Sequence, residues 1–257
     1  MKVDDNSEKN LLEEVIGGGG GRVILVEDRV ETSGSFVLHH LLKSSFSSDS
    51  PPSVVIFVAL SRPFSHYHRI SKKLGCNLLI QKENNRLFFL DMLKLQCPGD
   101  ARNNDNNVLV ELFGKIQNAV EISSSLEYNK GYINIMIDEL SLLEITTHGS
   151  VDEILNFLHY CHTLTSGLGC SLVMLNHEDI YSDALDRRLL SQVEYLADVV
   201  IKAEPLATGL SADVHGQLTV WNKGNYGENR HSRNNVSNFH FKVKENGVDY
   251  FYPGSLA

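Results

Sequence analysis

Short apolar runs alternate with amphipathic stretches along most of this 257-residue chain. The apolar runs are nearly continuous, which is typical of strands that are covered on both faces of a sheet. We expect strands at residues 22–27, 54–60, 78–80, 87–90, 132–138, 171–176 and 197–202. Apolar residues at helical spacing predict helices over residues 34–42, 108–120 and 151–164. This alternation predicts an α/β fold, in which a mainly parallel sheet carries helices on both faces.

The pattern changes after residue 202, where strands follow one another without helices between them. Residues 217–221 are expected to pair back on the preceding strand. Residues 239–243 and 248–252 then form a hairpin, because Asn246-Gly247 between two apolar runs favours a tight turn. The sheet therefore has a C-terminal antiparallel extension.

Residues 22–42 have the order strand, tight turn and helix in which a phosphate-binding loop lies. Such a loop needs glycines whose N–H groups converge on phosphate, a Lys for the outer phosphates and a Ser or Thr for Mg²⁺. Aligned with the pattern G-x-x-x-x-G-K-[ST], this chain has Asp28 and Ser33 at the two glycine positions. Gly34 replaces the Lys, and only Ser35 matches. The frame is retained, whereas most groups that bind a nucleotide are missing.

Three carboxylates surround this turn, those of Glu27, Asp28 and Glu31. They place negative charge where a triphosphate would lie, and two like charges ~4 Å apart repel by about 4 kcal/mol at an effective dielectric constant of about 20. We therefore predict degenerate Walker motifs and no catalytic residue.

The strand at residues 132–138, YINIMID, ends in an acid. P-loop proteins place the Walker B carboxylate at the end of such a strand, next to the metal. Asp138 is then the equivalent of that carboxylate, as Ser33, Gly34 and Ser35 are equivalents of the loop. The other interpretation is that Asp138 caps the helix that follows it.

Composition limits the classes of protein that remain. Hydrophobic residues make up 42% of the chain, enough for one sizeable core. We interpret residues 22–257 as a single domain, and residues 1–21, which end in five glycines, as a flexible N-terminal segment. The net charge of −9 excludes a strongly basic nucleic-acid binder but leaves local basic patches open. No apolar run approaches the ~20 residues that span a bilayer, so no membrane contact is expected.

Cysteines and the N-terminus predict the compartment. Cys76, Cys97, Cys161 and Cys170 are far apart and form no C-x-x-C pair, which indicates free thiols in a reducing compartment. The first ten residues are polar and acidic, unlike a secretory signal. We expect a cytoplasmic protein.

Histidines occur as a pair, His66 and His68, ahead of a cationic helical segment with Arg69, Lys72 and Lys73. The pair is compatible with a metal site or with the polar start of a helix, and the second interpretation is favoured because a metal site needs more ligands. We predict no metal and no cofactor.

Three stretches together are familiar: FVALSRPFSHYHRISKKLG (57–75), EILNFLHYCHTL (153–164) and AEPLATGLSADVHGQLTVW (203–221). They resemble the sixth-subunit family of the eukaryotic Elongator complex, and the resemblance covers most of the chain from Arg22 on. Members of that family have a RecA-like (P-loop NTPase-like) fold without working Walker motifs. The degraded loop at residues 28–35 agrees with this.

The resemblance implies that the chain joins two related RecA-like subunits in a hetero-hexameric ring with two copies of each. It implies that the ring binds tRNA and attaches to the catalytic part of Elongator, which places a carboxymethyl-type modification on the wobble uridine. The chain itself would be a non-catalytic pseudo-ATPase in the cytoplasm and also the nucleus, with any ATP hydrolysis left to other subunits. An active RecA-like ATPase is the alternative.

The resemblance also indicates where RNA would bind. In RecA-like rings the loops after the Walker B strand and after the next strand face the central pore, and here only the second, residues 177–188, carries cations. We expect Arg187 and Arg188 to contact tRNA phosphates, and the alternative is a solvated basic pair. Arg230 and Arg233 form a second candidate site.

Overall fold

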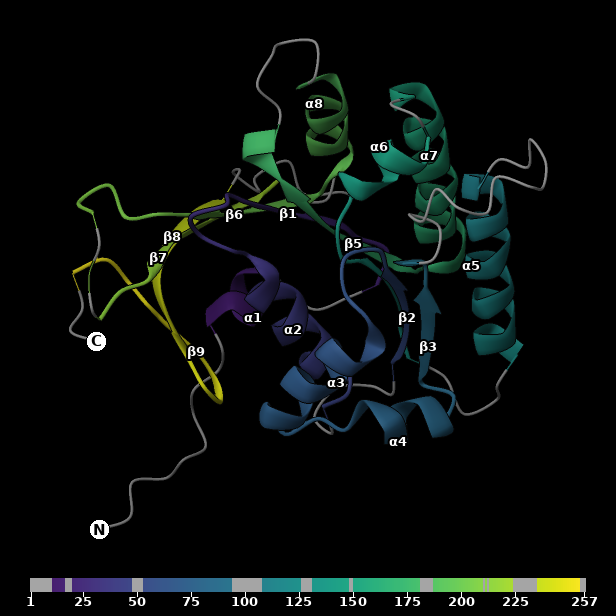
Figure 1. Cartoon of the computed structure of the whole chain (residues 1–257), viewed down its shortest axis with the longest axis horizontal. Coiled ribbons are helices and arrows are strands. Elements are labelled where there is room, and N and C mark those ends of the chain that lie inside the picture. Colours follow the sequence, from purple (N-terminus) through teal and green to yellow (C-terminus); the bar gives the residue numbers. More distant parts are fainter. Residues whose placement is uncertain are drawn as a thin grey trace.

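The computed structural model describes residues 11–16, 20–47, 53–93, 108–125, 131–147, 150–180, 187–209, 211, 213–223 and 235–254. Within these ranges the chain forms one sheet of nine strands in the order β3-β2-β4-β5-β1-β6-β7-β8-β9 (Figure 1). The strands are β1 (Val23–Asp28), β2 (Val54–Ala59), β3 (Leu87–Asp91), β4 (Ile133–Ile137), β5 (Ser171–His177), β6 (Val199–Glu204), β7 (Gly216–Asn222), β8 (Asn235–Lys244) and β9 (Gly247–Phe251).

The helices are α1 (Leu11–Ile16), α2 (Ser35–Ser44), α3 (Phe64–Lys73), α4 (Leu78–Glu83), α5 (Val108–Ser125), α6 (Leu142–Thr146), α7 (Val151–Leu168) and α8 (Arg187–Leu196), with the 3-10 turn η3 (Glu178–Ile180) after β5. In the described part of the chain, none of them is both long and apolar enough to cross a membrane.

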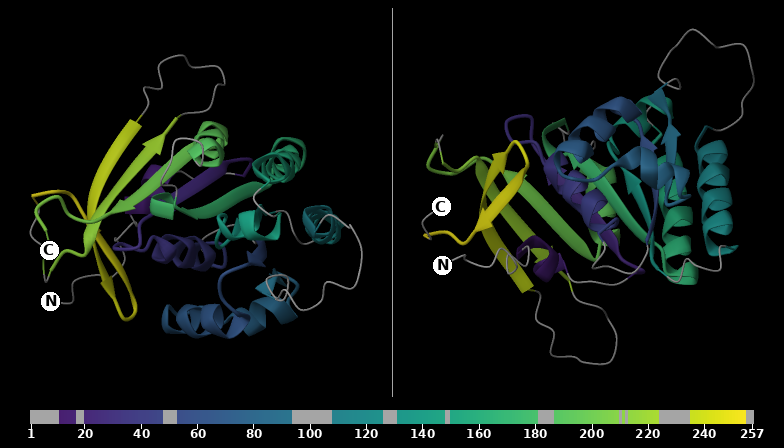
Figure 2. Two further views of the ribbon diagram at one scale, coloured as in Figure 1. Left: turned by 45° about the horizontal axis from the view of Figure 1, so that its top comes forward. Right: turned by 90° about the horizontal axis from the view of Figure 1, so that it is seen from below.

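The six strands from β3 to β6 in the sheet order run parallel, and β7, β8 and β9 continue the sheet antiparallel. The antiparallel strands, green to yellow, extend away from α5 (Figure 2). The α/β fold, the mainly parallel sheet and the C-terminal antiparallel extension are thereby confirmed.

One predicted strand is wrong, because residues 78–80 are the first turn of α4. Asn77 explains the difference: its side-chain oxygen accepts a hydrogen bond from the Leu79 N–H at 3.1 Å and so caps the helix. A run of three apolar residues does not distinguish a strand from a helical turn.

Alternate residues of the central strands point into two hydrophobic cores, which is why these strands have so few polar positions. In β2, Ile56 and Val58 belong to the core on the side of α5 and α7, whereas Val55 and Phe57 belong to the core on the side of α2. Helices α1 to α4 cover one face of the sheet and α5 to α8 cover the other (Figure 1).

Helix α1 lies within the segment that the sequence indicates to be flexible. Its Leu12 is fully buried and its Ile16 is nearly so, both in the core on the α2 side. The Asn222 side chain of β7 donates a hydrogen bond to the Val15 carbonyl at 3.2 Å. Residues 11–16 are thus packed against the antiparallel part of the sheet.

The carboxyl ends of the parallel strands meet at one edge of the sheet. Ligands of open α/β sheets bind at this edge, beside the strand where the order of the sheet reverses. That strand is β1, which lies between β5 and β6. Asp28 ends β1 and His177 ends β5, and the two residues are partners in the strand register.

Candidate functional site

The turn after β1 is short and closed, unlike a loop that wraps around phosphates. The Thr32 N–H donates to the Arg29 carbonyl at 2.9 Å, which closes a four-residue turn. The Val30 N–H donates to Asp179 Oδ2 of η3 at 2.8 Å. Backbone donors that a phosphate would need are therefore used within the protein.

Asp28 lies at the position where helix α2 would receive an anion. Its side chain is 1% exposed, and Oδ2 accepts a hydrogen bond from the Gly34 N–H at 2.6 Å. Gly34 is the residue that precedes α2, and free N–H groups at a helix N-terminus attract phosphates or carboxylates. The internal carboxylate thus occupies the anion site of the helix.

Gly34 is required for this close approach. A Cβ added there would lie 3.1 Å from Val26 Cγ1 and 3.2 Å from Asp28 Cβ, closer than most such contacts. The position that holds Lys in a phosphate-binding loop has therefore become a packing position, where a side chain would force Val26 or Asp28 to shift by a few tenths of an ångström.

His177 joins the ends of three strands. Its Nδ1 is hydrogen bonded to Asp28 Oδ1, and its Nε2 lies 2.5 Å from Glu139 Oε2, just after β4. Hydrogen bonds to Asp28 and Glu139 raise the pKa of His177 from 6.5 to about 10, so the imidazolium is the form present at neutral pH. Ser141 in turn donates to Glu139 Oε1 at 2.6 Å.

This ion pair network predicts a pH dependence of stability. Because the native pKa of His177 lies above its unfolded value, the stabilisation is complete below about pH 6.5 and is lost as pH rises towards 10. The melting temperature of the wild type should therefore fall between pH 6.5 and 9 more steeply than that of His177→Gln. His159→Gln, at an exposed position of α7, is the matched control and should follow the wild type. Parallel curves for all three proteins would contradict this prediction.

Asp138 is buried and both of its oxygens are engaged. Oδ1 accepts from the Leu60 N–H at 2.7 Å, and Oδ2 accepts from the Ser61 N–H at 3.0 Å and the Tyr67 hydroxyl at 2.5 Å. Burial raises the pKa of Asp138, although these hydrogen bonds oppose the shift. The carboxylate holds the loop between β2 and α3. One interpretation of the sequence expects Asp138 to cap the helix that follows it, but its hydrogen bonds go to Leu60, Ser61 and Tyr67 instead. The same hydrogen bonds leave neither oxygen open to a metal.

A second ionic cluster lies on the other side of β1. Lys202 Nζ is 2.7 Å from Glu27 Oε2 and 3.0 Å from Glu194 Oε1. Burial raises the pKa of Glu27 from 4.5 to about 7 against the opposing effect of Lys202. Burial also lowers the pKa of Lys202, but its bonds to Glu27 and Glu194 outweigh this and raise it. Lys202 is thus a charged group that is already paired.

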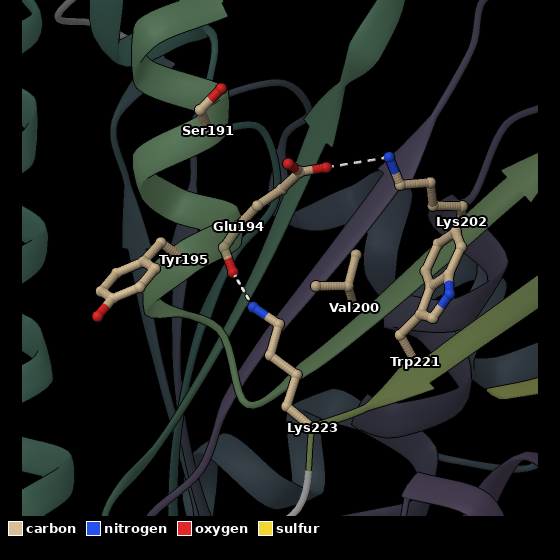
Figure 3. Close-up of a pocket in the computed structure, with 7 residues that line it drawn as sticks. All are labelled: Ser191, Glu194, Tyr195, Val200, Lys202, Trp221 and Lys223. Carbon is tan, nitrogen blue, oxygen red and sulfur yellow. Dashed lines mark hydrogen bonds and ion pairs between the residues drawn. The ribbon is translucent and has the colours of Figure 1, made fainter. Parts of the chain in front are cut away.

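This cluster borders a pocket of about 430 Å³ between α8 and the strands β6 and β7 (Figure 3). The Lys202 ammonium lies 5.5 Å from the centre of the Trp221 ring, and Lys223 Nζ donates to the Glu194 carbonyl. Both lysines on the wall of the pocket therefore have partners within the protein. An anionic ligand would have to share these lysines with partners that the protein already supplies.

Of the residues predicted from the sequence to correspond to a nucleotide site, the structure brings together those of the loop but does not join them to Asp138. Ser33 Oγ donates to Ser35 Oγ at 3.0 Å beside Gly34. Among the described residues, no contact links Ser35 with Asp138, the pair that would share a magnesium ion.

Of the four arginines predicted to contact RNA, the structure describes two. Arg187 and Arg188 begin α8, and Arg188 forms an exposed ion pair with Asp152 of α7 at 2.7 Å. Arg230 and Arg233 lie outside the described residues.

Sequence reasoning misses His177, Glu139 and Lys202 as members of the site. A signal was present, because each lies at or just after the carboxyl end of a predicted strand. Polar side chains at that edge of a parallel sheet converge in space.

Comparison with known proteins shows the family. A model of the Elongation complex protein 6 family matches residues 6–245. The chain belongs to this family. Elongator complex protein 6 from Homo sapiens is 32% identical over 244 residues, which cover 87% of this chain and 88% of the human protein. The protein of the same name from Danio rerio is 30% identical and covers 90% of both chains.

Solved structures show that this member of the Elongation complex protein 6 family has a RecA-type fold. A KaiC-like protein from Pyrococcus horikoshii OT3 superposes with a TM-score of 0.63 at 12% identity, over 93% of this chain and 94% of that chain. An uncharacterized protein from Pyrococcus horikoshii, in complex with an unknown peptide, has a TM-score of 0.66 at 16% identity, over 95% and 97% of the two chains. RecA-like architecture is therefore confirmed at low sequence identity.

Proposed function

We propose that this chain is a non-catalytic subunit of the Elongator complex. In this proposal it joins two related RecA-like subunits in a hetero-hexameric ring, which binds tRNA and supports the carboxymethyl-type modification of the wobble uridine by the catalytic subcomplex. Family membership supports the assignment to the complex. The hydrogen bond from Gly34 to Asp28 carries the non-catalytic part, because it fills the anion site of α2 with a side chain of the protein.

The metal position gives independent support for a subunit without ATPase activity. Asp138 accepts hydrogen bonds from the Leu60 and Ser61 N–H groups and the Tyr67 hydroxyl rather than facing an open site. To bind Mg-ATP in the usual way, the protein would have to release both Asp28 and Asp138 from short hydrogen bonds and replace the missing Lys.

A ring protomer must offer two different faces to its neighbours. One candidate face is the groove between α5 and α7, where Val110 is 67% exposed and Tyr160 is 59% exposed beside Phe113. Large exposed apolar side chains of this kind are typical of protein contacts. For RNA, Arg187 and Arg188 remain the proposed contacts on α8.

Native mass spectrometry tests the ring directly. The chain should form a hexamer with two copies of each subunit only when it is co-expressed with its two relatives, and that hexamer should bind tRNA. A monomer or homo-oligomer that ignores the relatives would contradict the proposal.

Nucleotide binding separates the scaffold from the alternative, an active ATPase. A ligand at 100 times its dissociation constant stabilises a protein by about 2.7 kcal/mol, which raises the melting temperature of a domain of this size by about 5–10 °C. We expect Mg-ATP to leave the melting temperature of the isolated chain unchanged. A rise of several degrees, abolished by EDTA, would support the ATPase.

A further inference from the structure

Positive charge is concentrated in one segment of this acidic chain. Residues 61–82 hold five of the 23 Lys and Arg residues and none of the 32 Asp and Glu residues. The segment comprises the loop after β2, helix α3 and most of α4, on the face of the sheet that the right-hand view of Figure 2 shows. A solvated helix face usually mixes both signs of charge, so the complete absence of acids requires a reason.

The cations form one stripe, which starts at Arg62 in the loop before α3 and continues on the helix. Arg62, Arg69, Lys72 and Lys73 are exposed, whereas Tyr67 and Ser71 of the same helix are buried against the protein. Lys72 and Lys73 follow Arg69 by three and four residues, spacings that return to one side of a helix. Helix α3 has ten residues and is about 15 Å long at 1.5 Å per residue, so cations along it reach past several phosphates of a nucleic-acid strand.

These cations are not used by the fold. Within the described residues, none of Arg62, Arg69, Lys72 and Lys73 has an ion pair, whereas three lysines of other elements each have one. The paired lysines are Lys115 with Glu111, Lys242 with Asp213 and Lys244 with Asp249. Four neighbouring cations without acidic partners create a positive potential that attracts a polyanion.

Helix stabilisation accounts for only part of the stripe. Lys72 and Lys73 lie in the last turn, where a cation interacts favourably with the helix dipole. Arg62 precedes the first turn, where the dipole repels a cation, and it crowds His66, whose pKa burial and the charges of Arg62 and Arg69 lower. The helix dipole therefore accounts for Lys72 and Lys73 but not for Arg62.

The stripe also differs from a protein interface. Among the described residues of α3, no large hydrophobic side chain is strongly exposed, and the exposed Leu79 and Ile80 of the same segment lie on α4. The cores of protein interfaces are apolar or aromatic and poor in Lys, whereas phosphate contacts come mainly from Arg and Lys.

We propose that the α3 stripe of Arg62, Arg69, Lys72 and Lys73 binds the phosphate backbone of RNA, at a surface separate from Arg187 and Arg188. The inference rests on the proposed function, because tRNA is the RNA that the ring would present. Contacts of this kind position RNA without reading its sequence, so they should act equally on different tRNAs.

The test uses the assembled ring and a fluorescently labelled tRNA transcript at 50, 100 and 200 mM KCl. The stripe variant carries Arg69→Gln, Lys72→Gln and Lys73→Gln. The matched control removes the same charge elsewhere, with Lys115→Gln, Lys242→Gln and Lys244→Gln. At 50 mM KCl we expect the stripe variant to bind about tenfold more weakly, and the slope of log affinity against log salt to flatten by about 2, whereas the control keeps the wild-type slope.

The outcomes separate this inference from the proposed function. Equal slopes for the stripe variant and the control would overturn the stripe while leaving tRNA binding intact. If native mass spectrometry shows that the stripe variant does not assemble into the ring, the stripe is a contact between subunits, and the inference is overturned as well. If the wild-type ring binds no tRNA, the proposed function fails and the inference fails with it.

Discussion

Asp138→Ala will lower the free energy of unfolding by about 3–5 kcal/mol. The substitution removes the acceptor of three hydrogen bonds, from the Leu60 and Ser61 N–H groups and the Tyr67 hydroxyl. Buried donors without an acceptor cost about 1–3 kcal/mol each, and the loop after β2 cannot turn all three to water. Urea unfolding followed by circular dichroism gives the value, provided that the slope with denaturant is unchanged.

Tyr67→Phe is the control for this result. It deletes one donor and leaves the carboxylate bonded to two backbone N–H groups, so it should cost only about 1 kcal/mol. The ordering of the two variants decides the role of Asp138. A carboxylate kept for a metal would give the opposite result, because its removal in the absence of metal would relieve charge repulsion and stabilise the protein.

Lys202→Met will destabilise the protein by about 3–5 kcal/mol at pH 8, because it leaves the carboxylate of Glu27 buried without its cation. Glu27 is 1% exposed, and its pKa is already about 7 with Lys202 present. A raised native pKa means that the folded state binds more protons than the unfolded state, so stability falls as pH rises from about 4.5 through 7. The defect should therefore shrink markedly at pH 5, where Glu27 is neutral.

The double variant Glu27→Gln, Lys202→Met isolates the charge. It removes both partners and should recover most of the stability at pH 8. Replacing both members of a buried ion pair costs less free energy of unfolding than removing one and leaving the other charge buried alone. Chemical unfolding at pH 5 and pH 8 measures the whole cycle. Equal losses for Lys202→Met at the two pH values would show that packing of the Lys202 stem on Trp221, rather than charge, dominates.

Much of the fold follows from the sequence because burial imposes a pattern. Strand β2 is apolar at every position because Ile56 and Val58 face one core while Val55 and Phe57 face the other. The run at residues 78–80 shows the limit of the same logic. Its apolar residues are shared by strands and helical turns, and only the preceding Asn77 signals the helix.

The candidate site is less predictable because it depends on register and backbone direction. The sequence indicates that Asp28 repels phosphate, but not that it replaces phosphate at the Gly34 N–H. That contact depends on the turn closed by the hydrogen bond from Thr32 to Arg29, after which Gly34 lies beside Asp28. His177 lies 149 residues from Asp28, and only the pairing of β5 with β1 makes them neighbours.

The hydrogen bond between Asp28 and Gly34 has a consequence for how this protein can change over generations. To regain a phosphate site, the chain would need a Lys at position 34, where even a Cβ lies 3.1 Å from Val26, and a glycine in place of Asp28. Removing Asp28 first leaves His177 with one carboxylate, and enlarging Gly34 first crowds Val26 and Asp28 of β1. Each single substitution lowers stability before any affinity for nucleotide appears. Selection for stability therefore opposes both routes, and the loss of the phosphate site is difficult to reverse in evolution.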